Sequence, residues 1–134
     1  GCFVAPTIIE VPSIRALTDE HFGPILHVAR FRAGELEQVV EDINATGFGL
    51  TLGLHSRIAA TRDFVRARAR VGNFYVNRNQ IGAVVESQPF GGEGLSGTGP
   101  KAGGPHYLAR FATERVMTID TTAAGGNASL LAAG

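Results

Sequence analysis

Two short stretches of the sequence combine residue types that suit the binding of a small molecule. The first is the turn at residues 18–24, where Glu20 and Phe22 stand two positions apart, ahead of a Gly-Pro pair. A carboxylate on such a turn can accept paired hydrogen bonds from vicinal hydroxyls, as on a ribose, while the ring covers an apolar face of the ligand. Because acidic turns are common, a solvated turn without a ligand is the alternative.

The second stretch is residues 82–104, where eight glycines stand in 23 positions. Glycine at that density costs backbone entropy, so a physical reason for it is expected, such as close approach to a ligand. Gly82-Ala83 exposes backbone N–H groups that no large side chain crowds, which suits an anion, and Phe90 can pack against the aliphatic part of the same ligand. The alternative is a glycine-rich connection with a structural role alone.

Three further patterns resemble reactive or cofactor sites and are rejected. Cys2 is the single thiol, and no helix terminus or neighbouring histidine is expected to activate it, so a packing or incidental cysteine is predicted. The run Gly92-x-Gly94-x-x-Gly97 lacks the preceding strand and the following helix of a dinucleotide-binding fingerprint. No metal site is expected, because the histidines share no metal-ligand spacing. They are His21, His27, His55 and His106.

The composition and charge of the chain narrow its class. Twelve Lys and Arg balance twelve Asp and Glu among 134 residues, so the net charge is zero and nucleic-acid binding by this segment is not expected. One cysteine excludes an internal disulfide framework, and no apolar run approaches the ~18 residues of a transmembrane segment. This composition predicts an intracellular globular piece. The sequence begins without Met and runs directly into a strand-like segment, so we expect a segment of a longer chain.

Strand-like and helical patterns alternate along the chain, which predicts an α/β fold with a largely parallel sheet. Apolar residues recur at i, i+3, i+4 and i+7 from Leu36, which predicts a helix over residues 35–44. Ser56 can cap a second helix. The inward face of that helix is expected to carry Ile58, Phe64 and Val65. The expected strands are residues 3–11, 25–31, 49–55, 73–77 and 113–120, with a short helix near residues 106–111.

Three motifs, in this order and spacing, resemble the C-terminal third of the aldehyde dehydrogenase superfamily. They are Glu20-x-Phe22-Gly23-Pro24, Gly72-Asn73-x-x-Val76-Asn77 and Pro89-Phe90-Gly91-Gly92-x-x-x-Ser96-Gly97. More narrowly, the runs at residues 47–57, 82–105 and 121–128 resemble the bacterial bifunctional enzymes that oxidise proline to glutamate. The resemblance covers essentially the whole chain. It implies part of an open, largely parallel twisted sheet with helices, followed by a C-terminal oligomerisation strand and tail.

The resemblance also implies an activity and site residues. The parent would be an NAD-dependent L-glutamate γ-semialdehyde dehydrogenase, which oxidises the aldehyde to L-glutamate in the second step of proline catabolism. By motif position, Glu20 would bind the nicotinamide ribose hydroxyls and Phe22 would lie beside the nicotinamide. Gly82 and Ala83 would offer backbone N–H groups to the substrate α-carboxylate, and Phe90 would line the aldehyde pocket.

The motif positions further imply what this segment lacks. In the family, the nucleophilic cysteine, the general-base glutamate and the Rossmann-like cofactor domain all lie N-terminal to these motifs. Cys2 does not match the nucleophile's motif, so no catalytic residue is assigned in this segment, which alone is expected to be inactive. Any FAD would belong to a separate upstream proline dehydrogenase domain. Asn77 would be a structural residue near the catalytic loop.

The expected partners are the aldehyde substrate, the rest of the parent polypeptide and further copies of the chain. Residues 1–112 are expected to be the C-terminal part of the catalytic domain. Residues 113–134 are expected to form the oligomerisation strand and tail that build a homo-oligomer. The parent protein is expected in the cytoplasm, with peripheral attachment to the inner membrane as an option. Two alternatives remain open: another semialdehyde dehydrogenase, such as one for succinate semialdehyde, and a non-catalytic assembly module.

Overall fold

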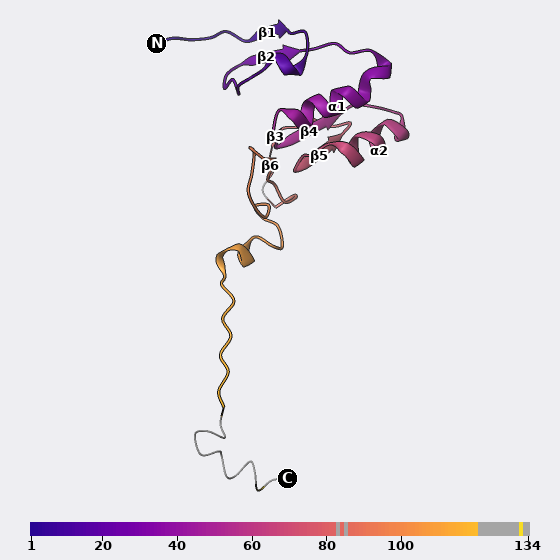
Figure 1. The fold of residues 1–134 in the computed structure, drawn as a ribbon. Coiled ribbons are helices and arrows are strands. Elements are labelled where there is room, and N and C mark those ends of the chain that lie inside the picture. Colours follow the sequence, from indigo (N-terminus) through magenta and orange to yellow (C-terminus); the bar gives the residue numbers. More distant parts are fainter. Residues whose placement is uncertain (83, 85, 121–131, 133–134) are drawn as a thin grey trace.

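The computed structural model describes residues 1–82, 84, 86–120 and 132, and these residues form small paired strands and two α-helices (Figure 1). In chain order the strands and α-helices are β1 (Thr7–Glu10), β2 (Ile25–Val28), α1 (Leu36–Ala45), β3 (Phe48–Gly49), β4 (Thr51–Leu54), α2 (Ala59–Arg68), β5 (Asn73–Val76) and β6 (Glu93–Gly94). Short 3₁₀ helices span Ile14–Ala16, Ala33–Glu35 and Leu108–Phe111. The predicted α/β class is therefore confirmed, with each regular element from β1 to β5 near its expected position.

The strands pair as three separate two-stranded sheets within the described residues. Strands β1 and β2 are parallel, β4 and β5 are parallel, and β3 runs antiparallel to β6. The predicted β4–α2–β5 crossover is confirmed, whereas β2 and β4 are not paired across α1 in the described part of the chain. After α1 the chain turns at Gly47, whose φ is +76°, and its next two residues pair with the glycine-rich loop.

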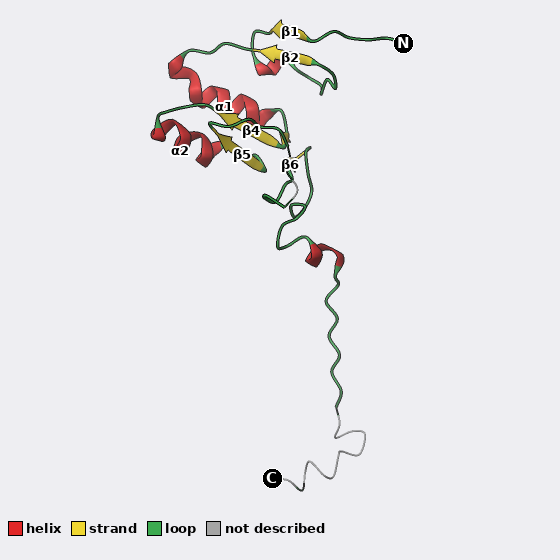
Figure 2. Cartoon of the chain, turned by 180° about the vertical axis from the view of Figure 1, so that it is seen from behind, coloured by secondary structure: helices red, strands yellow, loops and turns green. Residues whose placement is uncertain are grey.

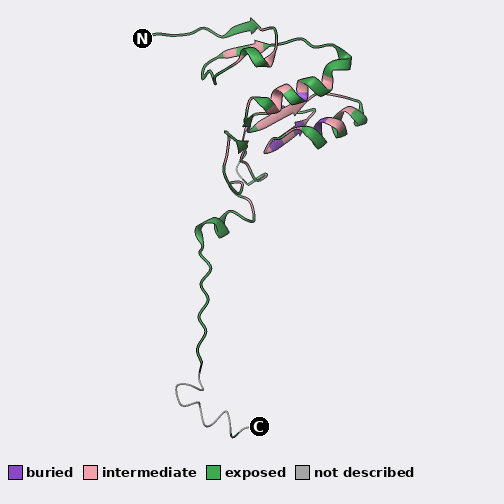
Figure 3. Cartoon of the chain, in the orientation of Figure 1, coloured by how far each residue is buried: buried purple, intermediate pink, exposed green. Residues whose placement is uncertain are grey.

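The small core lies where the two α-helices cover the β4–β5 pair (Figure 3). Val40 of α1, Val65 of α2 and Tyr75 of β5 are the buried apolar side chains of the described residues. Val65 was expected to face inward, and Phe64 is half-buried. The prediction for Ile58 is wrong, because α2 begins only at Ala59 and the extended Ile58 that precedes it stays exposed. The core therefore combines one buried apolar side chain from each α-helix with one from β5.

The C-terminal ends of β4 and β5 are joined by the side chain of Asn77, which contacts the backbone of Ser56. Asn77 has φ +54°, a left-handed conformation that asparagine tolerates better than most residues. Its Oδ1 accepts from the Ser56 N–H at 2.9 Å and its Nδ2 donates to the Ser56 carbonyl at 3.0 Å. Ser56 does not cap α2 directly; its Oγ accepts from the Ile58 N–H one residue before the helix. Asn77 therefore has a structural contact that fixes where both strands end.

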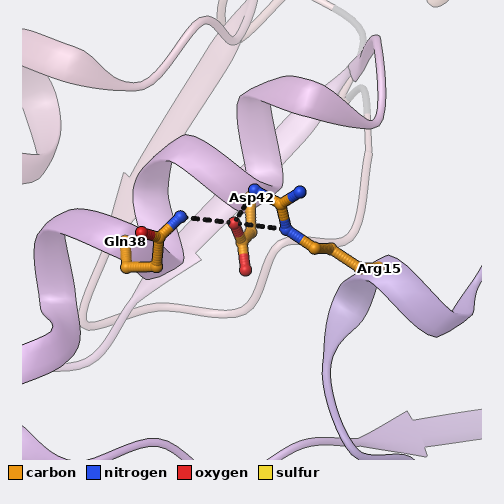
Figure 4. Close-up of polar contacts among 3 residues, drawn as sticks. All are labelled: Arg15, Gln38 and Asp42. Carbon is orange, nitrogen blue, oxygen red and sulfur yellow. Dashed lines mark hydrogen bonds and ion pairs between the residues drawn. The ribbon is translucent and has the colours of Figure 1, made fainter.

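The β1–β2 pair is tied to α1 by charged and polar side chains (Figure 4). Arg15 donates from Nε to Asp42 Oδ1 at 2.8 Å, and Gln38 Nε2 donates to the same oxygen at 2.8 Å. The hydrogen bond from Arg15, followed by the one from Gln38, holds the pKa of the Asp42 carboxyl below its ordinary value. This contact joins the first 3₁₀ helix to α1 at the protein surface.

The C-terminal part differs from the prediction. The expected helix near residues 106–111 is a single 3₁₀ turn, and residues 113–120 extend away from the sheets without regular secondary structure (Figure 2). Within the described chain these residues pair with no other strand, and because a strand needs a neighbour for its backbone groups, a strand that a further copy completes stays a prediction. Val116, Met117 and Ile119 are exposed there. The predicted tail at residues 121–134 lies outside the described residues except for residue 132.

Candidate functional site

The glycine-rich loop at residues 82–104 folds back on itself and holds Phe90 in place. Phe90 and Ala102 form an isolated antiparallel bridge, in which the Phe90 N–H donates to the Ala102 carbonyl at 3.0 Å and the Ala102 N–H donates back at 2.9 Å. The ring of the half-buried Phe90 lies against Gly82, where an added Cβ would stand 3.4 Å from the ring Cζ. The structure thus brings together two of the residues that the sequence singled out.

The pocket beside Phe90 has a volume of about 460 Å³. It is lined by Val84, Glu86, Ser87, Gln88, Pro89, Phe90, Ala102 and Gly103. Ala83, the other expected carboxylate anchor, lies outside the described residues. The ring at one wall and the bare backbone of Gly82 next to it give this region an apolar surface beside an unshielded main chain.

Close backbone packing accounts for several glycines of the loop and for Gly72, which lies before β5 and outside the loop. A Cβ at Gly72 would collide with the carbonyl oxygen of Gly91, and one at Gly97 would collide with the carbonyl oxygen of Gly92. These are contacts of main chain with main chain, so neither neighbour can move aside as a flexible side chain would. For Gly72, Gly92 and Gly97 the structural alternative therefore holds. Gly82 is different, because the nearest atoms to an added Cβ there belong to the Phe90 ring.

A buried polar network fastens the loop to β5. Asn73 is 9% exposed; its Nδ2 donates to the Pro89 carbonyl at 3.0 Å and its Oδ1 accepts from the Gly91 N–H at 3.2 Å. The Lys101 ammonium donates to the same Oδ1 at 3.2 Å, to the Gly91 carbonyl at 3.0 Å and to the Gly72 carbonyl. Each buried polar group thus has a partner, which is the condition for such a network to stabilise its surroundings.

Tyr75, two positions after Asn73 on the same strand, adds another contact to the loop. Its hydroxyl oxygen accepts from Gln88 Nε2 at 2.7 Å, and the Arg78 guanidinium lies over its ring, 4.3 Å from the centroid. Because side chains two apart on a strand point to the same face, Asn73 and Tyr75 both reach the loop. At the loop's far side, Ser96 Oγ accepts from the Gly49 N–H at 3.0 Å beside the β3–β6 pair.

Sequence reasoning missed this network. Two signals were present: Asn73 is a polar residue that begins an otherwise apolar strand run, and Lys101 is the single lysine of a chain with eleven arginines. Neither signal shows that the two residues meet, because they lie 28 positions apart and are joined only by the folded loop.

Glu20 and Phe22 lie on an open turn between the first 3₁₀ helix and β2. Phe22 is 92% exposed, and within the described residues the exposed Glu20 carboxylate has no hydrogen-bond partner. A hollow of about 230 Å³ beside Glu20 is lined by Ile14, Leu17, Asp19, Glu20, His21, His27, Thr46 and Phe48. A free carboxylate and an uncovered ring on one turn fit the hydroxyl groups and the flat face of a dinucleotide.

The two candidate regions are separate but joined through β3. Among the described residues, none lines both the hollow at Glu20 and the pocket at Phe90. Phe48 of β3 lines the hollow, while its backbone stands opposite Gly94 of the glycine-rich loop. The short β3–β6 pair therefore sets where one region lies relative to the other.

The other residues considered as reactive or metal-binding candidates are Cys2 and the histidines. Cys2 is exposed and free. His21 and His27 stand with ring centroids 5.6 Å apart, and the described part of the chain contains no group of three or more His, Cys, Asp or Glu placed to hold a metal ion. In the same residues, no helix is both long enough and apolar enough to cross a membrane.

Comparison with known proteins places these features in a family. The profile of the aldehyde dehydrogenase family matches residues 1–117. The chain belongs to this family. It is 61% identical over 115 residues to the bifunctional protein PutA of Klebsiella aerogenes, a match that covers 86% of this chain and 9% of that protein.

Solved structures agree with the sequence match. A mutant of proline utilization A from Bradyrhizobium japonicum superposes with a TM-score of 0.83 at 65% identity, covering 93% of this chain and 13% of that one. The 1-pyrroline-5-carboxylate dehydrogenase of Thermus with bound NAD gives 0.72 at 41% identity, covering 81% and 21%. The chain therefore spans about a tenth of the curated PutA relatives and a fifth of the shorter dehydrogenase.

Proposed function

We propose that this chain is the C-terminal part of an NAD-dependent L-glutamate γ-semialdehyde dehydrogenase, within a bifunctional proline-catabolic polypeptide. In that polypeptide it supplies the loop that anchors the substrate carboxylate and one wall of the NAD site. The kinship with PutA proteins and with 1-pyrroline-5-carboxylate dehydrogenases supports the reaction. The observation that carries the proposal is the placement of bare Gly82 against the fixed ring of Phe90.

The anchoring role follows from the chemistry of that placement. The backbone N–H groups of Gly82 and Ala83 donate to the substrate α-carboxylate, and the Phe90 ring packs on the methylene groups that lead to the aldehyde. An aldehyde without the carboxylate leaves these donors unpaired, which lowers its transition-state binding strongly. The side chain of Gln88, held by Tyr75, keeps the segment between Gly82 and Phe90 in register.

The open turn serves the cofactor. Glu20 accepts hydrogen bonds from the ribose hydroxyls next to the nicotinamide, and Phe22 lies beside the nicotinamide ring. NAD bound at this turn would supply the hydride acceptor for the oxidation. Neither side chain is engaged elsewhere within the described residues, which leaves the carboxylate and the ring free for these contacts. The nucleophile and the general base are supplied by other parts of the polypeptide.

The C-terminal residues serve assembly. Residues 113–120 carry exposed Val116, Met117 and Ile119 on an extended backbone with no neighbouring strand among the described residues. We propose that this segment pairs with a second copy of the dehydrogenase and becomes a strand there, with the tail at residues 121–134 lying across the partner. Two further points belong to the same proposal. The catalytic domain ends at residue 112, and the β1–β2 and β4–β5 pairs join one open sheet of that domain.

Substrate selectivity tests the proposal in the full-length polypeptide that carries this chain. Gly82→Val adds a branched side chain where only 3.4 Å separates a Cβ from the Phe90 ring, and it crowds the neighbouring N–H groups. We expect KM for L-glutamate γ-semialdehyde to rise about tenfold or more while KM for propionaldehyde changes less than about twofold. Ala83→Leu is expected to act in the same way.

Gly34→Val is the matched control, because nothing lies within 4 Å of its added Cβ, and it should leave both KM values unchanged. Equal losses for both aldehydes in Gly82→Val would contradict the anchoring role. A wild-type enzyme that prefers succinate semialdehyde to L-glutamate γ-semialdehyde would instead favour the alternative semialdehyde dehydrogenase.

A further inference from the structure

We propose that Lys101 is a positioning residue for the carboxylate site, because its ammonium group locks the backbone that fixes Phe90 beside Gly82. This inference rests on the function proposed above. It assigns a role in substrate selectivity to a residue that does not line the pocket and whose ammonium group contacts the start of β5 and the residue before it.

Lys101 fills a cage of three oxygens. Its Nζ donates to the Gly72 carbonyl, to the Gly91 carbonyl at 3.0 Å and to Asn73 Oδ1 at 3.2 Å. An ammonium group has three donors and no acceptor, so this cage satisfies all of them at once. The carbonyls come from two segments of backbone that approach each other too closely for a side chain at Gly72. The lysine therefore bridges the two segments where they are tightly packed.

The position of the cage determines the position of Phe90. Gly91 follows Phe90 directly, and Ala102 follows Lys101, so the bridge between Phe90 and Ala102 adjoins the contact between Lys101 and Gly91. Two backbone hydrogen bonds thus join Phe90 to Ala102, and one side-chain hydrogen bond joins Lys101 to Gly91, the residue next to Phe90. The Phe90 ring, fixed in this way, is the surface that backs Gly82.

Asn73 orients the lysine. Its Oδ1 accepts from both Lys101 Nζ and the Gly91 N–H, while its Nδ2 donates to the Pro89 carbonyl. The asparagine is buried, so the loss of the lysine would leave its oxygen and two carbonyls short of a charged donor in a place that water reaches poorly. Relaxation of the loop around residues 89–91 is the expected response, and Phe90 moves with it.

Arginine cannot take the place of lysine here. A guanidinium is planar and presents its donors as a wide fork, whereas the cage surrounds one compact nitrogen. Comparing Lys101→Arg with wild type therefore shows whether the site needs a compact ammonium group or only a positive charge. The compact cage also matches the use of a single lysine in a chain that otherwise employs arginine.

Selectivity kinetics of the full-length polypeptide test the inference with Lys101→Met, which keeps the length of the side chain and removes its donors. We expect KM for L-glutamate γ-semialdehyde to rise about tenfold, with kcat lowered less than about threefold and KM for propionaldehyde changed less than about twofold. Lys101→Arg should show the same pattern despite its charge. The milder Lys101→Gln, which restores two amide donors, should fall between Lys101→Met and wild type.

Arg30→Met is the matched control, since Arg30 makes an exposed ion pair with Glu10 far along the sequence from the loop, and it should leave all three constants unchanged. Lys101→Gln replaces Lys101→Met as the test if the latter fails to fold. Equal losses for both aldehydes, or full function of Lys101→Arg, would overturn the inference while leaving the proposed function intact. A wild-type enzyme with no preference for the carboxylated aldehyde would overturn both.

Discussion

The two candidate regions of this chain are organised in opposite ways. The glycine-rich loop is held by the chain's own atoms: a backbone bridge at Phe90, a buried asparagine, a caged lysine and glycines packed against glycines. The turn with Glu20 and Phe22 has almost none of this, and the Phe22 ring is 92% exposed. The glycine-rich loop is held in place by contacts within the chain, whereas the carboxylate and the ring of the turn make few contacts with the other described residues.

Under the proposed function, this difference gives the two regions different binding properties. A preorganised backbone anchor pays little conformational entropy when a small carboxylate arrives, which suits the discrimination of one substrate from another. An open turn suits a large ligand that makes its other contacts elsewhere and only touches the turn at its end. Substitutions in the loop should therefore change stability and selectivity together, and substitutions in the turn should change cofactor binding alone.

The largest effect is expected at Gly72. Gly72→Ala places a Cβ against the Gly91 carbonyl oxygen, and because both groups are main chain, the two segments must separate. We expect a local loss of about 3 kcal/mol in the free energy of opening the loop, at the upper end for overpacking. Hydrogen exchange of peptides covering residues 88–104 in the full-length polypeptide measures it.

Gly34→Ala is the control for this prediction, because an added Cβ there meets nothing within 4 Å. Exchange at residues 88–104 that is as slow in Gly72→Ala as in wild type would show that the loop does not depend on this close approach. The contrast between the two regions would then lose its main support.

The sequence predicted local elements well because their signals are local. The periodic apolar residues from Leu36 gave α1 within one residue at either end, and the Phe-Tyr-Val run after Asn73 gave β5. Residues 113–120 show the limit of such local signals, because a β-prone segment becomes a strand only where a second strand exists, and within the described chain none pairs with it. A strand formed there with a further copy stays a prediction.

The candidate site was predictable to a similar extent. Glycine density and one aromatic residue marked Gly82 and Phe90, and the structure brings these two into contact; their role in substrate binding stays a prediction. The reason for much of the glycine, however, is backbone packing at Gly72, Gly92 and Gly97, which no count of residues reveals. The cage around Lys101 was invisible in the sequence, because its oxygens come from residues up to 29 positions away.

A smaller effect is expected in the turn, and it should appear only in cofactor binding. Phe22→Ala removes a ring that makes almost no contact within the described residues, so hydrogen exchange throughout the full-length polypeptide should match wild type. KM for NAD should rise about fivefold, because the loss of an aromatic contact of about 1 kcal/mol weakens nicotinamide binding. Steady-state kinetics with varied NAD at saturating aldehyde measure it.

Leu108→Ala provides the comparison for Phe22→Ala, since Leu108 is 81% exposed and lies outside the turn, and it should leave KM for NAD unchanged. An unchanged KM for NAD in Phe22→Ala would mean that the open turn has no part in cofactor binding. The turn would then be the solvated alternative considered from its sequence.

The smallest effect is expected at the ion pair that ties the β1–β2 unit to α1. Hydrogen bonds from Arg15 and Gln38 lower the pKa of Asp42, so the pair stabilises the folded chain at pH values above the ordinary aspartate pKa. That contribution is lost as the pH falls through the lowered pKa of the folded state.

Arg15→Gln removes the larger cause of the shift and should speed hydrogen exchange in α1 slightly at neutral pH. The ratio of exchange rates between the variant and wild type cancels the intrinsic pH dependence, and it should fall toward one as the pH falls through the lowered pKa of Asp42. A ratio that stays constant with pH would mean that Arg15 acts on α1 through packing rather than through the Asp42 carboxylate. The β1–β2 unit would then be attached as the glycine-rich loop is, by contacts that acid does not weaken.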